Sequence, residues 1–459
     1  MLNAILHYDN GTIVIRGIGH IPFATFDPRT NALRAQALHY KDIIEYMRSS
    51  GIECEDHVLD LIPSPYLEAK GVVLRDYQQK ALNSWINAGM KGCIVLPTGA
   101  GKTIVGIKTI ERINSSSLIV VPTLDLMDQW VSVLAEHFNT QIGKLGGGED
   151  AIEAITVSTY DSAYIRASSL GNKFSLVIFD EVHHLPAPGY RSIAEQFASP
   201  FRLGLTATIE REDDLHKELP KLVGGVVFQV APSDLAEKKH LAGYTIERRR
   251  VEMLPKEMLE YKKNYGRFLF SIRRLGFRMN YPNAFQRLIM MSARSKLARD
   301  AILARNKAMN IALNSKAKFE ELTEILTENK SVKTIIFTQH NSLVHDISNQ
   351  FLIPFITHKS KKDERQDVLK GFKEGRYAAI VTSKVLDEGV DVPDAELGII
   401  VSGTGSSREF VQRLGRLLRP KQNDKTARLI EIVSMETKEI GTSSKRKKAL
   451  DKMNSEGEA

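Results

Sequence analysis

A glycine-rich segment near residue 100 has the residue types that bind phosphate groups. Residues Leu96–Thr103 read LPTGAGKT, follow a short apolar strand and precede a helical pattern. Glycines let backbone N–H groups approach phosphates, and a helix start favours an anion. In such loops the lysine neutralises the β and γ phosphates and the next hydroxyl joins Mg²⁺. We therefore expect an ATP and Mg²⁺ site with Lys102 as its catalytic lysine and Thr103 as a metal contact. The other predicted nucleotide contacts are Pro97, Thr98, Gly99, Ala100 and Gly101.

Two carboxylates follow the buried apolar run Leu176–Phe179. The carboxyl edge of a parallel sheet is where α/β proteins bind their ligands. We expect Asp180 to hold Mg²⁺ and Glu181 to orient and polarise the water that attacks ATP. The next pair, His183 and His184, lacks both a His-Glu-x-x-His helix and further ligands, which disfavours a metal site there. A coupling role beside the nucleotide is the better interpretation of His183.

Residues ahead of the phosphate loop could reach the base of the nucleotide. The segment Leu74–Gln78 (LRDYQ) opens the preceding helix and would bring the Arg75 guanidinium and the Gln78 amide near adenine. Arg and Gln are also common surface residues at helix starts, so this pentapeptide alone carries little weight.

A second arginine-rich segment lies far along the chain. Residues Gln412–Arg419 (QRLGRLLR) start a predicted helix, and Arg416 and Arg419 share one face of it. Alone, such a helix is usually a solvated face. Together with the phosphate loop and the Asp-Glu pair, it favours catalytic roles for Gln412, Arg416 and Arg419. The two guanidinium groups would contact the γ-phosphate when two lobes close.

Short apolar strands alternate with amphipathic helices in two stretches of the chain, which indicates two mainly parallel sheets. The first stretch has predicted strands at Cys93–Leu96, Leu118–Val121, Ile155–Ser158, Leu176–Phe179 and Leu203–Leu205. The second has them at Thr334–Phe337, Ile353–Thr357, Ala378–Thr382, Leu397–Val401 and Arg428–Val433. The expected fold class is α/β, with two parallel-sheet lobes.

The remaining segments are expected to form smaller parts. Residues 1–62 read as a separate α+β unit with a strand at Thr12–Arg16 and a helix at Lys41–Ser49. Ile246–Lys318 is expected to be helical and carries 18 Lys and Arg against 5 Asp and Glu. The predicted domains are residues 1–62, the ATP-binding lobe 63–240, the basic helical insert 241–318, the second lobe 319–440 and a tail at 441–459.

The composition restricts the classes of protein to which the chain can belong. With 459 residues, 42% hydrophobic and 26% charged, the chain suits several packed domains rather than a disordered or fibrous protein. No apolar run approaches the ~20 residues of a membrane span, and the first residues show no secretory pattern, so a cytoplasmic location is expected. Cys54 and Cys93 are too few for a disulfide framework, a four-thiolate zinc site or an iron–sulfur cluster.

The order of these segments resembles that of superfamily 2 helicases. The phosphate loop, in its short Pro-Thr-Gly form, precedes Asp180–His183 (DEVH), Leu205–Thr208 (LTAT), Phe337–Gln339 (FTQ) and Gln412–Arg419. Within that superfamily the chain resembles the xeroderma pigmentosum group B helicases in their short archaeal form, which implies that the two parallel-sheet lobes are RecA-like. Two further features carry this resemblance: Arg211-Glu212-Asp213 shortly after the LTAT segment, and the basic insert, which resembles that family's thumb.

This resemblance implies an ATP-dependent DNA helicase or translocase with 3′ to 5′ polarity, acting at single-strand and duplex junctions in nucleotide excision repair. The unit at residues 1–62 occupies the position of a damage-recognition domain, and a repair nuclease is an expected partner in a prokaryotic, nucleoid-associated setting. The resemblance also implies DNA-backbone contacts at Thr123, Thr159 and Thr382, a coupling motif at Asp387–Gly389, and strand separation by Arg211, Glu212 and Asp213.

The charge of the insert predicts DNA binding independently of the resemblance, because concentrated Lys and Arg release counterions from the phosphate backbone. Arg273, Arg274 and Arg278 are the expected phosphate contacts. Tyr261, Tyr265 and Phe268 fall at helical spacing. They could stack on unpaired bases, but packing within the insert is the favoured interpretation of that stripe.

Two other hypotheses stay open. The protein could be an ATP-driven DNA clamp that recruits a repair nuclease with little processive unwinding. A metabolic phosphate-loop kinase is the third possibility, but it gives no account of a second sheet domain with Arg416 and Arg419. Two lobes in one chain already complete an ATP site, so a monomer suffices.

Overall fold

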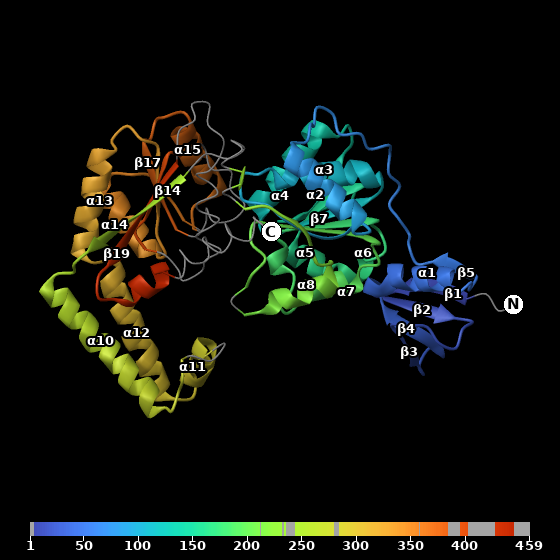
Figure 1. The fold of residues 1–459 in the computed structure, drawn as a ribbon, viewed down its shortest axis with the longest axis horizontal. Coiled ribbons are helices and arrows are strands. Elements are labelled where there is room, and N and C mark those ends of the chain that lie inside the picture. Colours follow the sequence, from blue (N-terminus) through green and yellow to red (C-terminus); the bar gives the residue numbers. More distant parts are fainter. Residues whose placement is uncertain are drawn as a thin grey trace. The chain divides into compact units, whose positions relative to one another are not determined.

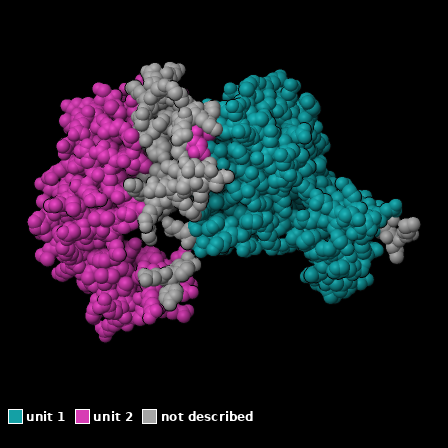
Figure 2. Space-filling view, in the orientation of Figure 1, with its two compact units in different colours: residues 1–230, 388–391 teal, residues 231–387, 392–459 magenta. Residues whose placement is uncertain are grey.

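The computed structural model describes residues 4–211, 213–231, 234–235, 244–279, 284–357, 359–383, 395–402 and 427–444. The chain divides into two compact units (Figure 2). One unit comprises residues 1–230 and 388–391, and the other comprises residues 231–387 and 392–459. In the described ranges, no helix combines the length and the apolar character needed to cross a membrane.

The first unit begins with a small α+β domain whose sheet has the order β3-β4-β2-β1-β5. Ile43 and Met47 of its helix α1 are buried in the domain's apolar core. The predicted strand Thr12–Arg16 is confirmed, and the predicted helix at Lys41–Ser49 is confirmed with one more residue at its start. The elements are β1 (Ala4–Asp9), β2 (Thr12–Arg16), β3 (Ala24–Asp27), β4 (Ala32–Gln36), the 3₁₀ turn η1 (Ala37–His39), α1 (Tyr40–Ser49) and β5 (Cys54–His57).

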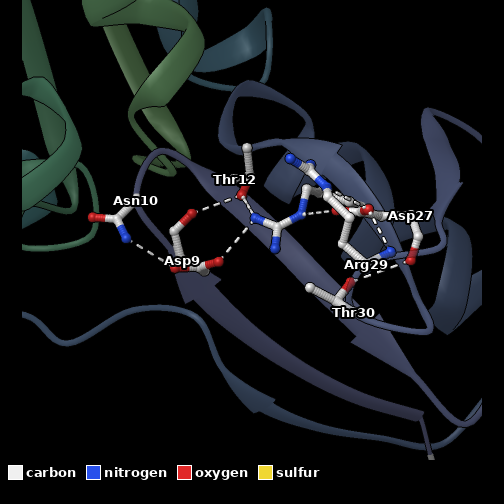
Figure 3. A network of polar contacts seen from close by, with 7 residues as sticks. Asp9, Asn10, Thr12, Asp27, Arg29 and Thr30 are labelled. Atoms are coloured by element: carbon white, nitrogen blue, oxygen red, sulfur yellow. Dashed lines mark hydrogen bonds and ion pairs between the residues drawn. The ribbon is translucent and has the colours of Figure 1, made fainter.

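Charged side chains join three strands of this small sheet (Figure 3). Arg34 of β4 donates from Nη1 to Asp9 Oδ2 (2.9 Å) and from Nε to Asp27 Oδ2 (3.2 Å). Arg29 binds Asp27 as well, and hydrogen bonds from Arg29 are the main reason that the pKa of Asp27 is lowered to about 2. Strands β1, β3 and β4 are therefore linked by charge-assisted hydrogen bonds.

The small domain packs on the first lobe through Tyr8. The Tyr8 hydroxyl lies 2.9 Å from the Ser168 carbonyl oxygen and 3.0 Å from that of Gln196. Gly171 permits this approach, because a Cβ there would come within 2.1 Å of the Tyr8 hydroxyl. These contacts help to make the small domain and the first lobe one compact unit.

The first lobe contains an eight-stranded sheet in the order β13-β6-β12-β11-β7-β10-β8-β9, and among its described strand pairs only β8 and β9 are antiparallel. Strands β7, β10 and β11 are buried along their whole length, which explains their continuous apolar sequences. The strands are β6 (Lys91–Val95), β7 (Ser117–Val121), β8 (Ile142–Gly146), β9 (Glu149–Ala151), β10 (Ile155–Thr159), β11 (Leu176–Asp180), β12 (Phe201–Thr206) and β13 (Val226–Gln229). The helices are α2 (Asp76–Asn87), α3 (Lys102–Ile113), α4 (Leu124–His137), α5 (Tyr160–Ile165), α6 (Ala167–Leu170), α7 (Arg191–Gln196) and α8 (Leu219–Leu222), with 3₁₀ turns η2 (Val182–His184) and η3 (Leu215–Glu218).

The second unit contains a six-stranded parallel sheet in the order β14-β19-β18-β15-β17-β16. Its strands are β14 (Tyr244–Val251), β15 (Thr334–Phe337), β16 (Phe355–Ile356), β17 (Ala379–Thr382), β18 (Leu397–Ile400) and β19 (Ala427–Ser434). The helices beside this sheet are α13 (Lys316–Glu328), α14 (Asn341–Phe351) and α15 (Lys362–Lys373). All ten strands predicted from the sequence in the two lobes are present, with ends shifted by at most two residues.

The basic insert is a group of helices attached to the second sheet (Figure 1). It consists of α10 (Pro255–Arg274), α11 (Ala284–Ser292) and α12 (Lys296–Leu313), and α10 packs along α12. The predicted helix is wrong for Ile246–Val251, because these residues belong to β14, which pairs with β19. Arg248 and Arg249 of this strand form ion pairs with Glu431 (3.3 Å) and Glu321 (3.2 Å).

Candidate active site

The phosphate loop leaves β6 and turns directly into α3. Gly99 (φ 85°) and Gly101 (φ 77°) adopt left-handed backbone conformations, which favour glycine. Helix α3 begins at Lys102, so its first N–H groups, which have no partner within the helix, face the loop. The Leu96 N–H donates to the Thr206 carbonyl oxygen (3.0 Å) and ties the loop to β12. The predicted sequence of strand, loop and helix is therefore present.

Lys102 and Glu181 lie at the same edge of the first sheet. Lys102 Nζ is 4.0 Å from Glu181 Oε1 and 3.4 Å from the Leu96 carbonyl oxygen. The two side chains are only 12% and 13% exposed. Their proximity follows from the strand order, because only β12 separates β6 from β11 and all three strands are parallel. The Lys102 ammonium is thus placed to bind the phosphate groups of a triphosphate, and the Glu181 carboxylate is placed to orient a water molecule beside them.

Asp180 ends β11 and is buried. Trp130 Nε1 donates to Asp180 Oδ2 (2.7 Å), and the Glu181 backbone N–H donates to Asp180 Oδ1 (3.0 Å). Burial, followed by the charge of Glu181, raises the pKa of Asp180 to about 6, although Lys102 and the Trp130 hydrogen bond act in the opposite direction. A cation bound at this carboxylate would favour its ionised form.

A chain of polar contacts joins Glu181 to Arg211. The Thr206 hydroxyl lies 3.2 Å from Glu181 Oε2 and 3.1 Å from His183 Nδ1. The His183 side chain is fully buried, and its carbonyl oxygen accepts a hydrogen bond from Arg211 Nη1. Arg211 also forms a bidentate pair with Asp213, at 2.8 and 2.7 Å. The Glu181 carboxylate and Arg211 and Asp213 of the Arg-Glu-Asp segment are therefore connected through Thr206 and His183.

Gln78 contacts the phosphate loop. Its Nε2 donates to the Ala100 carbonyl oxygen (2.9 Å), and its Oε1 accepts from the Arg75 backbone N–H (2.9 Å). Tyr77 also donates to the Ala100 carbonyl oxygen (2.8 Å). The start of α2 is thus bound to the loop, while the predicted contacts of Gln78 and Arg75 with adenine stay predictions.

The residues at this edge suit a magnesium ion that arrives with a nucleotide. Mg²⁺ is usually held by one or two protein oxygens together with phosphates and water, and Asp180 and Thr103 offer a carboxylate and a hydroxyl. The Thr98 hydroxyl in the loop is buried without a hydrogen-bond partner, as expected where a ligand completes the site. Among the residues that the structure describes, no three His, Cys, Asp or Glu side chains form a metal site of their own. The donor set therefore suits an ion that shares phosphate oxygens.

Thr123 and Thr159, the predicted DNA-backbone contacts of the first lobe, each cap a helix at the carboxyl edge of the sheet. The Thr123 side chain accepts from the Leu126 N–H at the start of α4, and that of Thr159 accepts from the Ser162 N–H at the start of α5. The preceding strands, β7 and β10, are neighbours. The two threonines thus lie along the edge that carries the phosphate loop, and their contact with DNA stays a prediction.

In the second unit the structure separates the predicted phosphate contacts from the aromatic stripe of the insert. Arg273, Arg274 and Arg278, at and just after the end of α10, are exposed. Tyr261 and Phe268 are only 3% exposed and pack within the insert, with Tyr265 partly buried beside them. The packing interpretation, which the sequence favoured for this stripe, is confirmed for Tyr261 and Phe268.

Thr382 closes β17 and is fully buried, and its hydroxyl donates to the Ser383 carbonyl oxygen (3.0 Å). This placement does not present the hydroxyl to a DNA backbone. The other predicted site residues, Glu212, Gln412, Arg416 and Arg419, and the segment Asp387–Gly389, lie outside the described residues.

Two contacts of the site were missed from the sequence. Thr206 lies in the LTAT segment, whose place after the DEVH segment was the available signal. Trp130 gives no local signal, because its partner Asp180 is 50 residues away.

The first sheet has a phosphate loop and an acidic pair at its carboxyl edge, and the same chain has a second parallel sheet. These features define a phosphate-loop ATPase with the architecture of helicase motors. Three family models match the chain: the res subunit of type III restriction enzymes at residues 71–211, the ERCC3/RAD25/XPB C-terminal helicase at 299–453, and the xeroderma pigmentosum group B helicase damage recognition domain at 6–58.

A relative that matches almost the whole chain shows the family. The chain is 45% identical over 445 residues to the DNA 3′-5′ translocase XPB2 of Sulfurisphaera tokodaii, which covers 96% of this chain and 99% of that protein. The chain therefore belongs to the xeroderma pigmentosum group B (XPB) helicase family, as the resemblance predicted.

More distant relatives are longer proteins. The DNA 3′-5′ helicase XPB of Kineococcus radiotolerans is 28% identical, with 87% of this chain and 65% of that protein covered. The general transcription and DNA repair factor IIH subunit XPB/SSL2 of Saccharomyces cerevisiae is 27% identical, with 91% and 47% covered. The chain thus spans about half the length of the yeast relative.

A solved structure supports the fold. The Hef helicase domain of Pyrococcus furiosus matches with a TM-score of 0.52 and 18% identity, covering 82% of this chain and 98% of that one. The expected α/β class with two RecA-like lobes is confirmed.

Proposed function

We propose that this protein is an ATP-dependent DNA translocase and helicase that moves 3′ to 5′ and remodels duplex DNA during nucleotide excision repair. Relatives at 45% and 28% identity have the names DNA 3′-5′ translocase and DNA 3′-5′ helicase. The observation that best supports ATP hydrolysis is the approach of Lys102 Nζ to Glu181 Oε1, 4.0 Å, beside the glycine-rich loop. The enzyme is a DNA-dependent ATPase that releases ADP and phosphate.

The residues of the first lobe have separate roles in hydrolysis. Lys102 and the first N–H groups of α3 bind the β and γ phosphates. Glu181 accepts a hydrogen bond from the attacking water and orients it, while Thr206 holds the other carboxylate oxygen. Magnesium, bound by Asp180 and Thr103 with ATP, would supply positive charge at the phosphate oxygens.

The second unit adds the DNA grip and the transition-state charge in this proposal. The exposed Arg273, Arg274 and Arg278 of the insert contact DNA phosphates without regard to sequence, as a motor requires. From the sequence, Arg416 and Arg419, with Gln412, stabilise the charge that develops on the γ-phosphate.

The proposal keeps the domains expected from the sequence. Residues 1–62 serve DNA damage recognition, residues 63–240 and 319–440 form the motor lobes and residues 441–459 form a tail. Of the predicted insert 241–318, strand β14 (Tyr244–Val251) belongs to the sheet of the second lobe, and helices α10 to α12 form the basic insert. The match of residues 6–58 to a damage recognition domain model supports the first assignment. The protein acts at the nucleoid as a monomer, with a repair nuclease as its partner.

The alternative function is an ATP-driven DNA clamp that recruits a nuclease without processive unwinding. One observation favours it: the Arg211 side chain is 16% exposed and bound to Asp213 and the His183 carbonyl oxygen. An arginine with these contacts is suited to couple the DEVH segment to Asp213 rather than to separate DNA strands.

Measuring ATP hydrolysis and strand displacement together separates the two functions. Hydrolysis is followed with and without DNA, beside release of a labelled strand from a duplex with a 3′ tail, for the wild type and for Arg211→Ala. A helicase displaces the strand during DNA-stimulated hydrolysis, and Arg211→Ala loses displacement while it still hydrolyses ATP. Stimulated hydrolysis without displacement by the wild type identifies the clamp.

The site assignment is tested in the same assay with two lysines of α3. Lys102→Ala should abolish hydrolysis and displacement. Lys108→Ala removes a lysine that pairs with Glu111 (2.7 Å), and this variant should retain both activities. DNA-stimulated hydrolysis by Lys102→Ala would refute the site.

A further inference from the structure

Trp130 is fully buried in α4 and donates its indole N–H to the carboxylate of Asp180, with Nε1 2.7 Å from Oδ2. The other oxygen, Oδ1, accepts from the Glu181 backbone N–H at 3.0 Å. One fixed donor on each oxygen sets the plane of the carboxylate. Each oxygen keeps a further lone pair, so the group can still bind a cation.

The same indole ring lies against the helix that follows the phosphate loop. A Cβ at Gly106 of α3 would come within 2.7 Å of Trp130 Cη2. Glycine inside a helix is destabilising relative to alanine, and the close approach of the indole explains its presence here. Trp130 therefore contacts both Asp180 and the helix that begins at Lys102.

Trp85 provides a comparison within the same lobe. It is also fully buried, and its Nε1 donates to the Arg202 backbone carbonyl oxygen at 2.9 Å. A buried indole N–H usually finds such a partner. Trp130 differs because its partner is a side-chain carboxylate of the candidate metal site.

We propose that Trp130 is a positioning residue that fixes the Asp180 carboxylate for magnesium, while its ring sets the distance between that carboxylate and the phosphate-loop helix. The inference rests on the proposed role of Asp180 in holding the metal. Groups that orient metal ligands typically contribute about 10- to 100-fold in metal affinity. The same helix α4 begins at the cap formed by Thr123, so it carries a predicted DNA contact at its start and the Asp180 contact further along.

The magnesium requirement of ATP hydrolysis tests this role in the full chain. Initial rates are measured at saturating ATP and DNA while free Mg²⁺ is varied, for the wild type, Trp130→Phe and Trp85→Phe. Phenylalanine keeps an aromatic ring but has no N–H donor. In Trp130→Phe the Mg²⁺ concentration for half-maximal rate should rise about tenfold, and the rate at saturating Mg²⁺ should return to within about threefold of the wild type.

Trp85→Phe is the matched control. A purely structural role predicts that the two variants lose thermal stability and keep the wild-type Mg²⁺ requirement. The positioning role predicts that only Trp130→Phe changes this requirement. An unchanged requirement in folded Trp130→Phe overturns the inference.

Tryptophan fluorescence provides a second readout that needs no turnover. The chain contains two Trp residues, so Trp85→Phe leaves Trp130 as its only indole. Titration of Mg²⁺ in the presence of ADP should change the Trp130 emission in a saturable way, and adding Asp180→Asn to this variant should remove the change. Emission that does not respond to Mg²⁺ overturns the inference, whether or not Trp130→Phe folds.

Failure of this inference is distinguishable from failure of the proposed function. A wild-type protein that does not hydrolyse ATP, or full activity of Asp180→Asn, would refute the ATP site itself. An active wild type, an inactive Asp180→Asn and an unchanged Mg²⁺ requirement in Trp130→Phe would refute only the role of Trp130.

Discussion

Glu181 adopts a left-handed backbone conformation (φ 47°) directly after the strand that ends at Asp180. For a residue other than glycine, this conformation costs on the order of 1–3 kcal/mol and persists where the surrounding structure enforces it. The turn lets the Glu181 N–H bind Asp180 Oδ1, while its carboxylate lies near Lys102 and Thr206. One strained position thus orients both carboxylates of the site.

Replacing Glu181 by glutamine should stop hydrolysis and leave nucleotide binding intact. The amide keeps the size of the side chain but loses the charge that polarises water, so kcat should fall by about 10²- to 10⁴-fold. ATP affinity should stay or increase, because a negative charge near the γ-phosphate is removed. Steady-state kinetics and titration with a fluorescent ATP analogue measure the two effects. A kcat within tenfold of the wild type would show that another group activates the water.

The sequence alone was sufficient to predict the placement of residues that lie in locally spaced motifs. Lys102, Asp180 and Glu181 were predicted because strand, loop and helix follow one another in the chain, and the structure brings Lys102 and Glu181 together. Trp130 could not be predicted, because its contact with Asp180 depends on how α4 packs on the sheet. The binding of Arg211 to the His183 carbonyl oxygen is likewise a tertiary contact without a local pattern.

At the scale of elements, the insert shows how a basic surface is built on a packed helix pair. Helices α10 and α12 bury Tyr261, Phe268 and Ala308 between them. The burial of this stripe leaves the arginines at the end of α10 on the surface. The fold of the insert therefore exposes the arginines of the proposed DNA contacts and buries Tyr261 and Phe268, which are not available for base stacking.

The combined variant Arg273→Ala, Arg274→Ala, Arg278→Ala should weaken DNA binding and reduce its salt dependence. Each lost phosphate contact removes about 0.9 from the slope of log K against log salt, so the slope should become shallower by roughly 2 to 3. Hydrolysis without DNA should be unaffected. Fluorescence anisotropy of a labelled duplex at several salt concentrations provides the measurement.

Lys262→Ala is the control on the same helix, because Lys262 is 59% exposed and its ammonium pairs with Glu436 (2.8 Å). Its slope should stay close to that of the wild type. Equal slopes for the wild type and the triple variant would remove the insert from the DNA-binding surface.

The prediction from the sequence was wrong at the boundary of the insert. The run Arg248-Arg249-Arg250 was assigned to a basic helix, yet it lies in strand β14. Its pairing strand β19 is remote in sequence, with Arg248 opposite Glu431. Besides Glu247 in β14 itself, the carboxylates that pair with Arg248 and Arg249 come from β19 and α13, which are remote in sequence, so the local pattern did not indicate a strand. The central strands of both sheets were predictable because their apolar runs reflect burial on both faces.

At the scale of the whole molecule, we propose different tasks for the two units. In the proposed function, the first unit binds the triphosphate and activates water through Lys102, Asp180 and Glu181. The second unit carries the basic insert and, by sequence, Arg416 and Arg419. A motor that couples ATP to movement needs hydrolysis to depend on both lobes, because only then does each catalytic cycle require a conformational change.

The most direct test of this claim is the rate of DNA-stimulated ATP hydrolysis by Arg416→Ala and Arg419→Ala at saturating ATP and DNA. Arginines that stabilise the transition state in phosphoryl transfer contribute about 10³- to 10⁵-fold to kcat. We expect kcat to fall by at least about 100-fold in each variant, while ATP binding changes much less. A wild-type kcat in both variants would mean that the first lobe hydrolyses ATP without the second, which would contradict the account.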